Sequence, residues 1–309
     1  MPHVALSDLG AGCAWDAQNW SCAYDVVYMV FYAMYGMSSP TWRIKWANES
    51  PVWNVPLARQ FNLLLADTAA SQYPSDMHSQ WFSGCRNTFR GQVAASNPTI
   101  FPYGRSFAPV GDILERLFGG PGKVPLAYQT LVCQSCDALA SDVHYSFSYL
   151  GLTANINRLC NDQDPAILPL QVAVDRFIRR YSTTPFEHYR LCGDCRSPQH
   201  VSSLCFPGES WIWFEQRPNM QTLCPSLELS CSQPATELTH VLAAIIYLGQ
   251  QHFTARIRDQ GTNMWWNYDS QWPDGAPQVI TVVLEMELRN FSERLPAFYI
   301  YRRCDTDGP

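Results

Sequence analysis

Three side chains of the sequence have the types that a thiol-dependent acyl transfer requires. Cys22 lies in the segment NWSCAYD, and His252 and Asp269 lie far along the chain on two short runs rich in aromatic residues. A cysteine nucleophile needs a histidine that removes its proton and an acid that orients the histidine. We therefore take Cys22, His252 and Asp269 as candidate nucleophile, base and orienting acid.

The stretch from Cys22 to Gly36, CAYDVVYMVFYAMYG, predicts a buried helix. Two residues of types that often cap helices, Asn19 and Ser21, precede it, and its apolar residues recur at helical spacing. A thiol in the first turn lies near the positive end of the helix dipole and near free N–H groups. These lower the pKa of the thiol and help to hold an oxyanion. The alternative is that Cys22 is an ordinary buried core residue.

The runs that carry His252 and Asp269 are joined by a turn-forming segment, residues 259–262. If the turn is centred between Gln260 and Gly261, antiparallel pairing puts His252 directly opposite Asp269. Opposite residues have Cβ atoms about 5 Å apart, so the carboxylate can fix the tautomer of the imidazole. A cysteine at a helix start, followed by a β-borne histidine and then an acid, is the papain-type order. The alternative is an ordinary hairpin with a surface histidine.

Two CxxC pairs, Cys133/Cys136 and Cys192/Cys195, can each supply two thiolates to a tetrahedral Zn²⁺ ion. The chain between the pairs is longer than in a compact zinc ribbon, so two separate hairpins must meet. Four cysteine ligands would make a closed, structural site without an open position for catalysis. The alternatives are free buried cysteines or a redox pair.

The elements that must position these residues change in type along the chain. Helical segments come first and β-rich runs follow, interrupted by one further helix, which predicts an α+β fold. No linker or internal repeat divides the chain, so we expect a single domain over residues 1–309. Helices are predicted over 22–36, 56–68, 78–91, 109–118 and 169–181, and strands within 123–133, 144–152, 210–217, 240–249, 252–258, 264–269, 279–289 and 298–303.

Composition narrows the classes of function. The chain has 309 residues, of which 47% are apolar, enough for a sizeable core. Its 27 acidic and 21 basic residues give a net charge of −6, which argues against nucleic-acid binding. The longest apolar run is shorter than the roughly 20 residues of a membrane helix. The N-terminal residues lack the pattern of a secretory signal, and the CxxC pairs indicate reduced thiols. We expect a cytoplasmic or nuclear protein without membrane association.

Taken in order, these motifs resemble those of the ubiquitin-specific protease family of deubiquitinases. NWSC, ending at Cys22, is similar to the family's Cys box N-x-G-N-T-C-Y. QHFTAR, from Gln251, and WWNYD, ending at Asp269, are similar to its His box G-H-Y-x-A-x-x-R and the following W-x-x-F-D. AFYIYRR, from Ala297, is similar to its last strand A-Y-x-L-x-Y-x-R. The resemblance spans nearly the whole chain and includes both CxxC pairs.

The resemblance implies a papain-like fold with a helical thumb at about 13–122, zinc-bearing β fingers at about 123–150 and 185–215, and a β-rich palm for the remainder. It implies a deubiquitinating isopeptidase that uses Cys22, His252 and Asp269 to cleave after the C-terminal Gly-Gly of ubiquitin. The implied partners are ubiquitin, polyubiquitin chains and ubiquitinated proteins, and the implied cofactor is structural Zn²⁺.

The resemblance also assigns substrate contacts. Asp112 and Glu115 match a D-x-x-E motif whose carboxylates receive the arginines of the ubiquitin tail. Their i, i+3 spacing puts both on one helix face. The alternative is a solvated acidic face. Phe253 and Trp266, with Trp15, are expected to line a narrow tunnel that admits only a tail ending in two glycines.

Some positions depart from the family pattern. The residue that matches the family's oxyanion-hole asparagine is Ala17, so we predict Asn19, or else Gln18, as the donor. Gln251 replaces the glycine before the histidine. These departures suggest a divergent branch of the family or an enzyme that has lost activity. The alternatives to a deubiquitinase are a protease for another modifier of the SUMO or NEDD8 type and an inactive module that binds ubiquitin. A zinc-stabilised structural protein is the third alternative.

Overall fold

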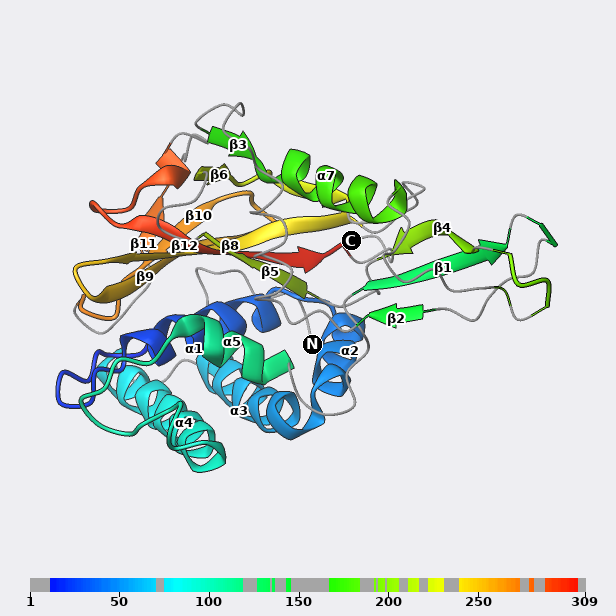
Figure 1. Cartoon of the computed structure of the whole chain (residues 1–309). Coiled ribbons are helices and arrows are strands. Elements are labelled where there is room, and N and C mark those ends of the chain that lie inside the picture. Colours follow the sequence, from blue (N-terminus) through cyan, green and yellow to red (C-terminus); the bar gives the residue numbers. More distant parts are fainter. Residues whose placement is uncertain are drawn as a thin grey trace.

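The structure, a computed structural model, has its helices early in the chain and most of its strands later, which confirms the α+β prediction (Figure 1). None of its described helices is long and apolar enough to cross a membrane. The residues described are 12–70, 75–118, 127–133, 135–136, 143–145, 167–183, 192, 194–197, 199–205, 211–216, 222–230, 239–272, 278–280 and 287–304.

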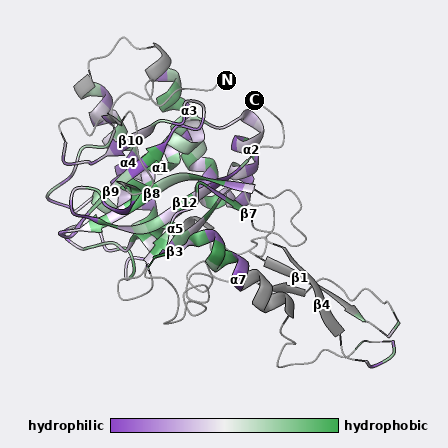
Figure 2. Ribbon diagram, turned by 90° about the horizontal axis from the view of Figure 1, so that it is seen from above, coloured by the Kyte–Doolittle hydropathy of each residue, from purple (hydrophilic) through white to green (hydrophobic). Residues whose placement is uncertain are grey.

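The central helix is α1, Cys22–Gly36, and every one of its residues is buried. A helix that is apolar on all sides needs neighbours on all sides. Helices α3, α4 and α5 contact α1, and on the opposite side α1 contacts the main sheet at β8 and β9 (Figures 1 and 2). The other helices are α2, Pro40–Glu49, α3, Pro51–Ala70, α4, Ser75–Ser96, α5, Val110–Phe118, and α7, Leu170–Thr183.

Helix α2 is an element that the periodicity analysis missed, although its start carries a clear signal. Ser39 caps it, its Oγ accepting a hydrogen bond of 3.2 Å from the N–H of Trp42, and Pro40 follows at the first helical position. Two of the apolar residues of α2, Trp42 and Trp46, are buried beside α1. A short helix with few apolar positions gives a weak periodic signal. The cap residue Ser39 and the following Pro40 are therefore the clearer sequence evidence for α2.

The main sheet has the strand order β11-β10-β9-β8-β12-β5, and β7 pairs with the free part of β8. Consecutive strands β8, β9, β10 and β11 are antiparallel neighbours, and the last strand, β12, lies between β8 and β5. The bounds are β5 Trp211–Glu215, β7 Glu228–Ser230, β8 Thr239–Gly249, β9 His252–Arg258, β10 Trp265–Tyr268, β11 Gln278–Ile280 and β12 Leu295–Arg303.

A separate sheet, in the order β2-β1-β4, extends away from the helices and the main sheet (Figure 1). Its strands are β1, Ala127–Cys133, β2, Val143–Tyr145, and β4, Gln199–Cys205, all antiparallel. A parallel pair, β3, Ile167–Pro169, and β6, Thr222–Cys224, lies near α7. Within the segment predicted as a strand over 279–289, residues 279–280 are in β11 and Glu287–Arg289 form a 3₁₀ turn. Residues 281–286 and 146–152 lie outside the described part of the chain.

The hairpin of β9 and β10 has a different register from the predicted one. Trp265 pairs with Arg258 and Tyr268 with Ala255, so the turn is centred between Gly261 and Thr262, one residue later than expected. The cause is Asp259, whose Oδ1 accepts hydrogen bonds from the N–H groups of Gly261 and Thr262 and closes a wider loop. Pairing partners therefore move by two residues, which leaves every side chain on its predicted face.

Candidate active site

Cys22 opens α1 with its side chain at the surface of a cleft. It is 5% exposed, and a hydrogen bond from the backbone N–H of Phe253 links its thiol to β9. Trp20, two residues earlier, has a φ of 48°, a backbone conformation that bulky residues rarely adopt. Such strain is maintained by surrounding structure and is concentrated at functional sites. The loop before Cys22 is thus held in one shape.

The acidity of Cys22 differs from the sequence-based expectation. Burial raises the pKa of its thiol, and the negative charge of Asp269 raises it further. The N–H groups of Phe253, Ala23 and Cys22 itself oppose this shift. In the free protein, the loss of hydration therefore has a larger effect on the pKa of Cys22 than the N–H groups at the helix start. A thiol of this kind keeps its proton until a nearby base removes it.

His252, the first residue of β9, contacts Asp269, which directly follows β10. Its Nε2 lies 2.7 Å from Oδ1 of Asp269, and the two residues are 4% and 6% exposed. The N–H of Gln271 donates to the same oxygen at 2.9 Å. The other oxygen, Oδ2, lies 3.8 Å from Nη2 of Arg294. A Nε2 bound to the carboxylate leaves Nδ1 of His252 available for a proton from a substrate or a thiol.

Cys22 and His252 line the same cleft, which has a volume of about 230 Å³. Trp15 contacts the ring of His252 edge to face, with centroids 6.2 Å apart. The backbone N–H of Trp15 donates to the carbonyl of Ser270, which joins the loop before Cys22 to the segment after Asp269. The remaining lining residues are Trp20, Phe107, Gln250, Gln251 and Gln271.

The two predicted oxyanion donors do not line this cleft. The side-chain amide of Asn19 donates to Oδ2 of Asp16 at 2.6 Å, and the N–H groups of Gln18 and Asn19 donate to Oδ1 of Asp16. The glutamines that line the cleft are Gln250, Gln251 and Gln271. Gln250 and Gln251 form a tight turn between β8 and β9 in which both have positive φ. The identity of the donor remains a prediction.

A buried polar network fixes the loop that leads to Cys22. Ser21 does not cap α1 through its side chain; its Oγ accepts from the N–H of Asp16 and donates to Asp25 at 2.8 Å. Arg86 of α4 forms an ion pair with Asp25 and also donates to the carbonyl of Ala14. Arg90, one turn further along α4, donates to the carbonyls of Asn19 and Gly104. The i, i+4 spacing of the arginines thus ties α4 to this loop.

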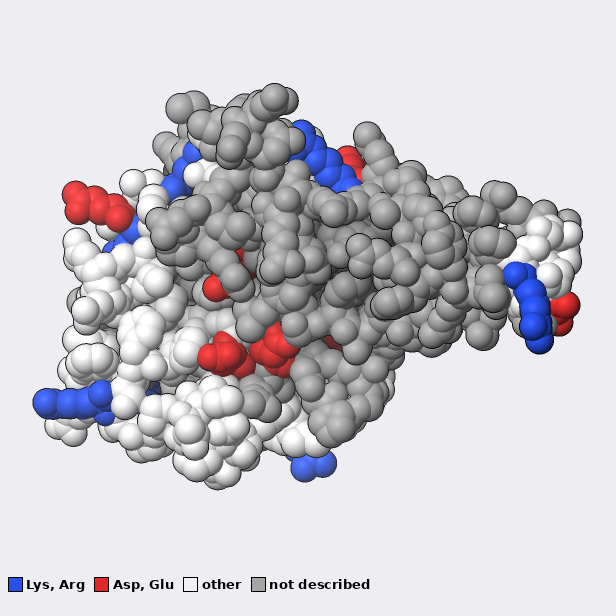
Figure 3. Space-filling view, viewed as in Figure 1, with Lys and Arg blue, Asp and Glu red and all other residues white. Residues whose placement is uncertain are grey.

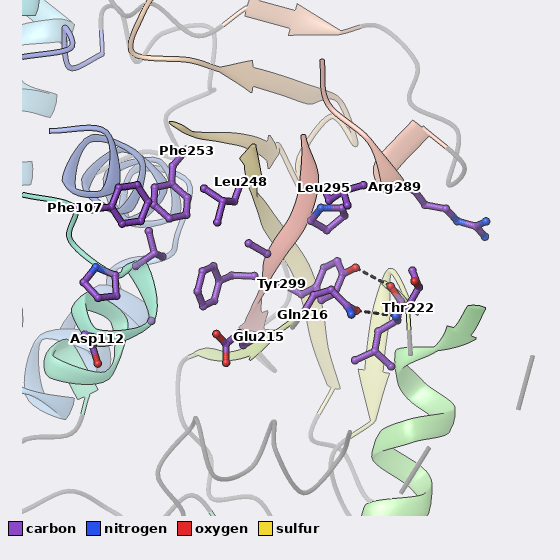
Figure 4. Close-up of a pocket in the computed structure, with 17 residues that line it drawn as sticks. Phe107, Asp112, Glu215, Gln216, Thr222, Leu248, Phe253, Arg289, Leu295 and Tyr299 are labelled. Carbon is purple, nitrogen blue, oxygen red and sulfur yellow. Dashed lines mark hydrogen bonds between the residues drawn. The ribbon is translucent and has the colours of Figure 1, made fainter. Parts of the chain in front are cut away.

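A second cavity, of about 590 Å³, forms a groove between α5 and the sheet strands β5 and β12 (Figure 4). Phe107 lines both this groove and the cleft of Cys22, and its ring lies 5.4 Å from that of Phe253. Asp112 of α5 and Glu215 of β5 line the groove from opposite sides (Figure 4). Acidic atoms gather in the middle of the same face of the molecule (Figure 3). Most residues that line the groove are apolar, and Asp112 and Glu215 add one carboxyl group on each side.

The predicted substrate contacts take different positions. Asp112 and Phe253 line the groove, whereas Glu115 and Trp266 line neither cavity. Trp266 is 8% exposed and belongs to the core. Sequence reasoning did not identify Glu215, which reaches the groove only because β5 joins the sheet beside β12. Arg294 was also missed, and no local motif marks it.

The four predicted metal ligands meet at one end of the β2-β1-β4 sheet. Cys133 ends β1 and the Cys192–Cys195 turn precedes β4, so antiparallel pairing of β1 and β4 brings the two turns together. Their Sγ atoms all lie within 4.8 Å of one another, with Cys133–Cys195 at 3.3 Å and Cys136–Cys192 at 3.5 Å. Thiolates at about 2.3 Å from Zn²⁺ in a tetrahedron lie about 3.8 Å apart. The cluster can hold a metal ion and fits zinc.

Asp269 is expected to make the stability of the fold depend on pH in the acid range. Burial alone would raise the pKa of Asp269, but hydrogen bonds from His252 and Gln271, and the charges of His252 and Arg294, together lower it below 3.8. The unfolded carboxyl keeps its ordinary pKa, so the stabilisation is complete above about pH 4 and is lost as the pH falls through the folded value. Urea unfolding of wild type and Asp269→Asn at a series of acidic pH values measures it. A stability difference that stays constant below about pH 4 would contradict this assignment.

Comparisons with known proteins identify a structural relative only. No protein-family model matches the chain, and a search of curated proteins gives no match. A solved structure of the SAGA DUB module, with Ubp8, Sgf11, Sus1 and Sgf73 bound to monoubiquitin, is similar with a TM-score of 0.56 and 12% identity. The match covers 99% of this chain and 71% of that one. A second structure of the Ubp8-Sgf11-Sgf73-Sus1 module has a TM-score of 0.43 and 10% identity, covering 97% and 69%.

Proposed function

We propose that this chain, which has the fold of the ubiquitin-specific protease Ubp8, is a cysteine isopeptidase that cleaves after the C-terminal glycine of ubiquitin. One observation carries the proposal. Cys22, at the start of a buried helix, lines one cleft with His252, whose Nε2 is 2.7 Å from Asp269. A nucleophile, a base and an orienting acid are the set that thiol-dependent acyl transfer requires.

In the proposed mechanism, Nδ1 of His252 removes the proton of Cys22 as substrate binds, because burial keeps the thiol protonated in the free protein. The thiolate attacks the carbonyl carbon of the ubiquitin C-terminal glycine. The backbone N–H of Cys22 and an amide of the cleft stabilise the oxyanion, each donor contributing about 2.7–4 kcal/mol. Protonated His252 then gives its proton to the lysine amine, which leaves as the tetrahedral intermediate collapses to a thioester. His252 next removes a proton from water, which hydrolyses the thioester and frees ubiquitin and the Cys22 thiol.

The groove supports a peptide tail as the substrate. It adjoins the cleft at Phe107, whose ring packs against the ring of Phe253 with centroids 5.4 Å apart. Glycines, which have no side chains, suit the segment of the tail that would lie against these packed rings. Asp112 and Glu215 line the groove from opposite sides, where guanidinium groups of an arginine-bearing tail would form charge-assisted hydrogen bonds. Glu215 thus takes the place beside Asp112 that the sequence motif gave to Glu115.

The four-cysteine cluster supports a structural zinc ion in the same protein. Cys133, Cys136, Cys192 and Cys195 would all be ligands, and the ion would join β1 to β4 far along the chain from the cleft. Hydrogen bonds from Ser197 and from Cys133 lower the pKa of Cys195 to about 6, which favours the thiolate. The four cysteines would occupy all four positions of a tetrahedral zinc ion and leave none for a substrate or water. We therefore assign the ion a structural role and no role in bond cleavage.

A ubiquitin probe with a C-terminal propargylamide tests the proposal directly. The thiolate of Cys22 is expected to add to the alkyne, giving a stable adduct that intact-mass measurement detects and peptide mapping places at Cys22. Cys22→Ala and Cys85→Ala, which removes another thiol of the helical layer, are the matched variants: only the first should prevent the adduct. Ubiquitin is the first probe because the similar SAGA DUB module was solved with bound monoubiquitin. The same reagent made from SUMO-type and NEDD8-type modifiers completes the panel.

Three results would overturn the proposal. Labelling only by a modifier without tail arginines would identify another modifier as the substrate. Binding of ubiquitin that is equal for wild type and Cys22→Ala, with neither adduct nor hydrolysis of ubiquitin-aminomethylcoumarin, would identify a binding module. Neither binding nor labelling would indicate a structural protein.

A further inference from the structure

We infer that Arg294 is a positioning residue of the active site, which holds Asp269 from the side opposite His252 and thereby sets the direction of the imidazole. Nη2 of Arg294 lies 3.8 Å from Oδ2 of Asp269, while Oδ1 contacts His252 and the N–H of Gln271. The two oxygens of the carboxylate therefore have partners on different sides. Rotation of the carboxylate would break the contacts of both oxygens.

Such a partner is needed because of where Asp269 lies. It directly follows Tyr268, the last residue of β10, so ladder hydrogen bonds do not extend to it. A carboxylate at a strand end depends on side-chain and loop contacts for its orientation. The side chains of Arg294 and Asp269 are only 12% and 8% exposed, so their attraction is screened less than that of a surface pair.

The backbone presents Arg294 through a tight turn. Phe291 and Arg294 exchange two backbone hydrogen bonds of 3.0 Å each, and the residues between them, Ser292 and Glu293, have φ values of 50° and 64°. Asn290 also accepts a hydrogen bond from the N–H of Glu293. Residues with side chains seldom adopt this left-handed conformation at two successive positions. The turn therefore fixes the start of β12 and the point from which Arg294 departs.

The sheet brings Arg294 to the active-site edge by way of Gly249. Leu295 of β12 pairs with Leu248 of β8, which puts Arg294 opposite Gly249, and Gly249 pairs with His252 of β9. Residues paired directly across strands point to the same face. Arg294, Gly249 and His252 thus lie side by side on one face, and Asp269 lies beyond His252.

Gly249 provides the space that the arginine side chain occupies. A Cβ atom at this position would lie 2.8 Å from Cγ of Arg294 and 3.1 Å from its Cα. Real Cβ atoms essentially never come within 3.0 Å of such a neighbour, so one of the two groups would have to move. The absence of a side chain at Gly249 is therefore linked to the path of Arg294.

The inference rests on the proposed function, and one of its two assays, alkylation of Cys22, needs no ubiquitin. Arg294→Ala is expected to lower kcat for ubiquitin-aminomethylcoumarin by about 10- to 100-fold, with KM changed less than about twofold, because misorientation affects the reaction more than binding. The rate of alkylation of Cys22 by iodoacetamide, which needs no ubiquitin, should fall by a similar factor. Arg294→Lys keeps the charge and should stay within about threefold of wild type. Arg303→Gln, at the far end of β12, is the matched control and should change neither rate.

Gly249→Ala provides an independent measurement. It should displace Arg294 and reproduce much of the Arg294→Ala loss, and in the double variant the two losses should combine to less than their product. Thermal unfolding of each variant shows that it is folded. Losses that multiply, an effect of Arg294→Ala on KM alone, or a lysine variant as slow as the alanine variant would overturn the inference. If wild type does not cleave ubiquitin, the proposed function is wrong, and the alkylation rates still decide the role of Arg294.

Discussion

Replacement of His252 by alanine is expected to lower kcat for ubiquitin-aminomethylcoumarin by at least about 10³-fold, the largest effect of any change that leaves Cys22 in place. The reason is the burial of the thiol, which raises the pKa of Cys22 and so makes the reaction depend on a base. Ubiquitin affinity should change little, since His252 is 4% exposed and contributes little surface to a partner. Stopped-assay kinetics measure kcat, and a binding isotherm on the same preparation measures the ubiquitin affinity.

The control for this prediction is His78→Ala in α4. His78 has an acidic neighbour of its own, with Nδ1 3.7 Å from Asp67, but it lies outside the cleft. Its replacement should leave kcat within about twofold of wild type, because His78 does not line the cleft of Cys22. Residues that act as a unit give non-additive losses, so Cys22→Ala with His252→Ala should be no slower than Cys22→Ala alone. Equal activity of the His252 and His78 variants would remove His252 from the mechanism.

Loss of one cysteine of the metal cluster is expected to have the largest effect on stability. Cys192→Ser should release the bound zinc and unfold the β1–β4 part of the chain, because structural zinc contributes on the order of 10 kcal/mol to the folding of small zinc domains. Metal content by mass spectrometry should fall from about one ion per chain to near zero. Limited proteolysis should then cut first between β1 and β4.

Cys224→Ser is the matched control, because Cys224 is a partly buried cysteine of β6 outside the cluster. It should retain zinc and resist protease like wild type. The rate of Cys22 alkylation should remain near the wild-type value in both variants, since the metal cluster and the cleft use different strands. A Cys192→Ser protein with full zinc content would contradict the ligand assignment.

Local pattern was sufficient for α1 and for the change from helices early in the chain to strands later. The run from Cys22 to Gly36 is apolar on all sides, and only a helix enclosed by other elements can bury it. The pairing of His252 with Asp269 depended on a turn, and the predicted turn centre was one residue early because Asp259 closes a wider loop. The contact between His252 and Asp269 is nevertheless present. A shift of the strand pairing by two residues keeps both side chains on the same face of the sheet.

Contacts between distant segments were less accessible to sequence reasoning. The motif over Asp112 and Glu115 gave two carboxylates on one helix face, whereas the groove takes its second carboxylate from Glu215, a residue of β5. Asn19 and Gln18 are close to Cys22 in sequence, yet neither lines the cleft, and the side-chain amide of Asn19 donates to Asp16 instead. Nearness in sequence is therefore a poor guide to which amide enters a cavity.

The sequence by itself determined the residue types at the candidate site, the α+β class and the two cysteine pairs, because these depend on local periodicity and short spacing. The tertiary structure alone decided that β12 lies between β8 and β5, and hence that Glu215 lines the groove and Arg294 reaches Asp269 across Gly249. The physical reason is that strand order arises from packing of the whole chain. Hydrogen-bonding groups of one strand can pair with any other strand, and no short segment specifies which one.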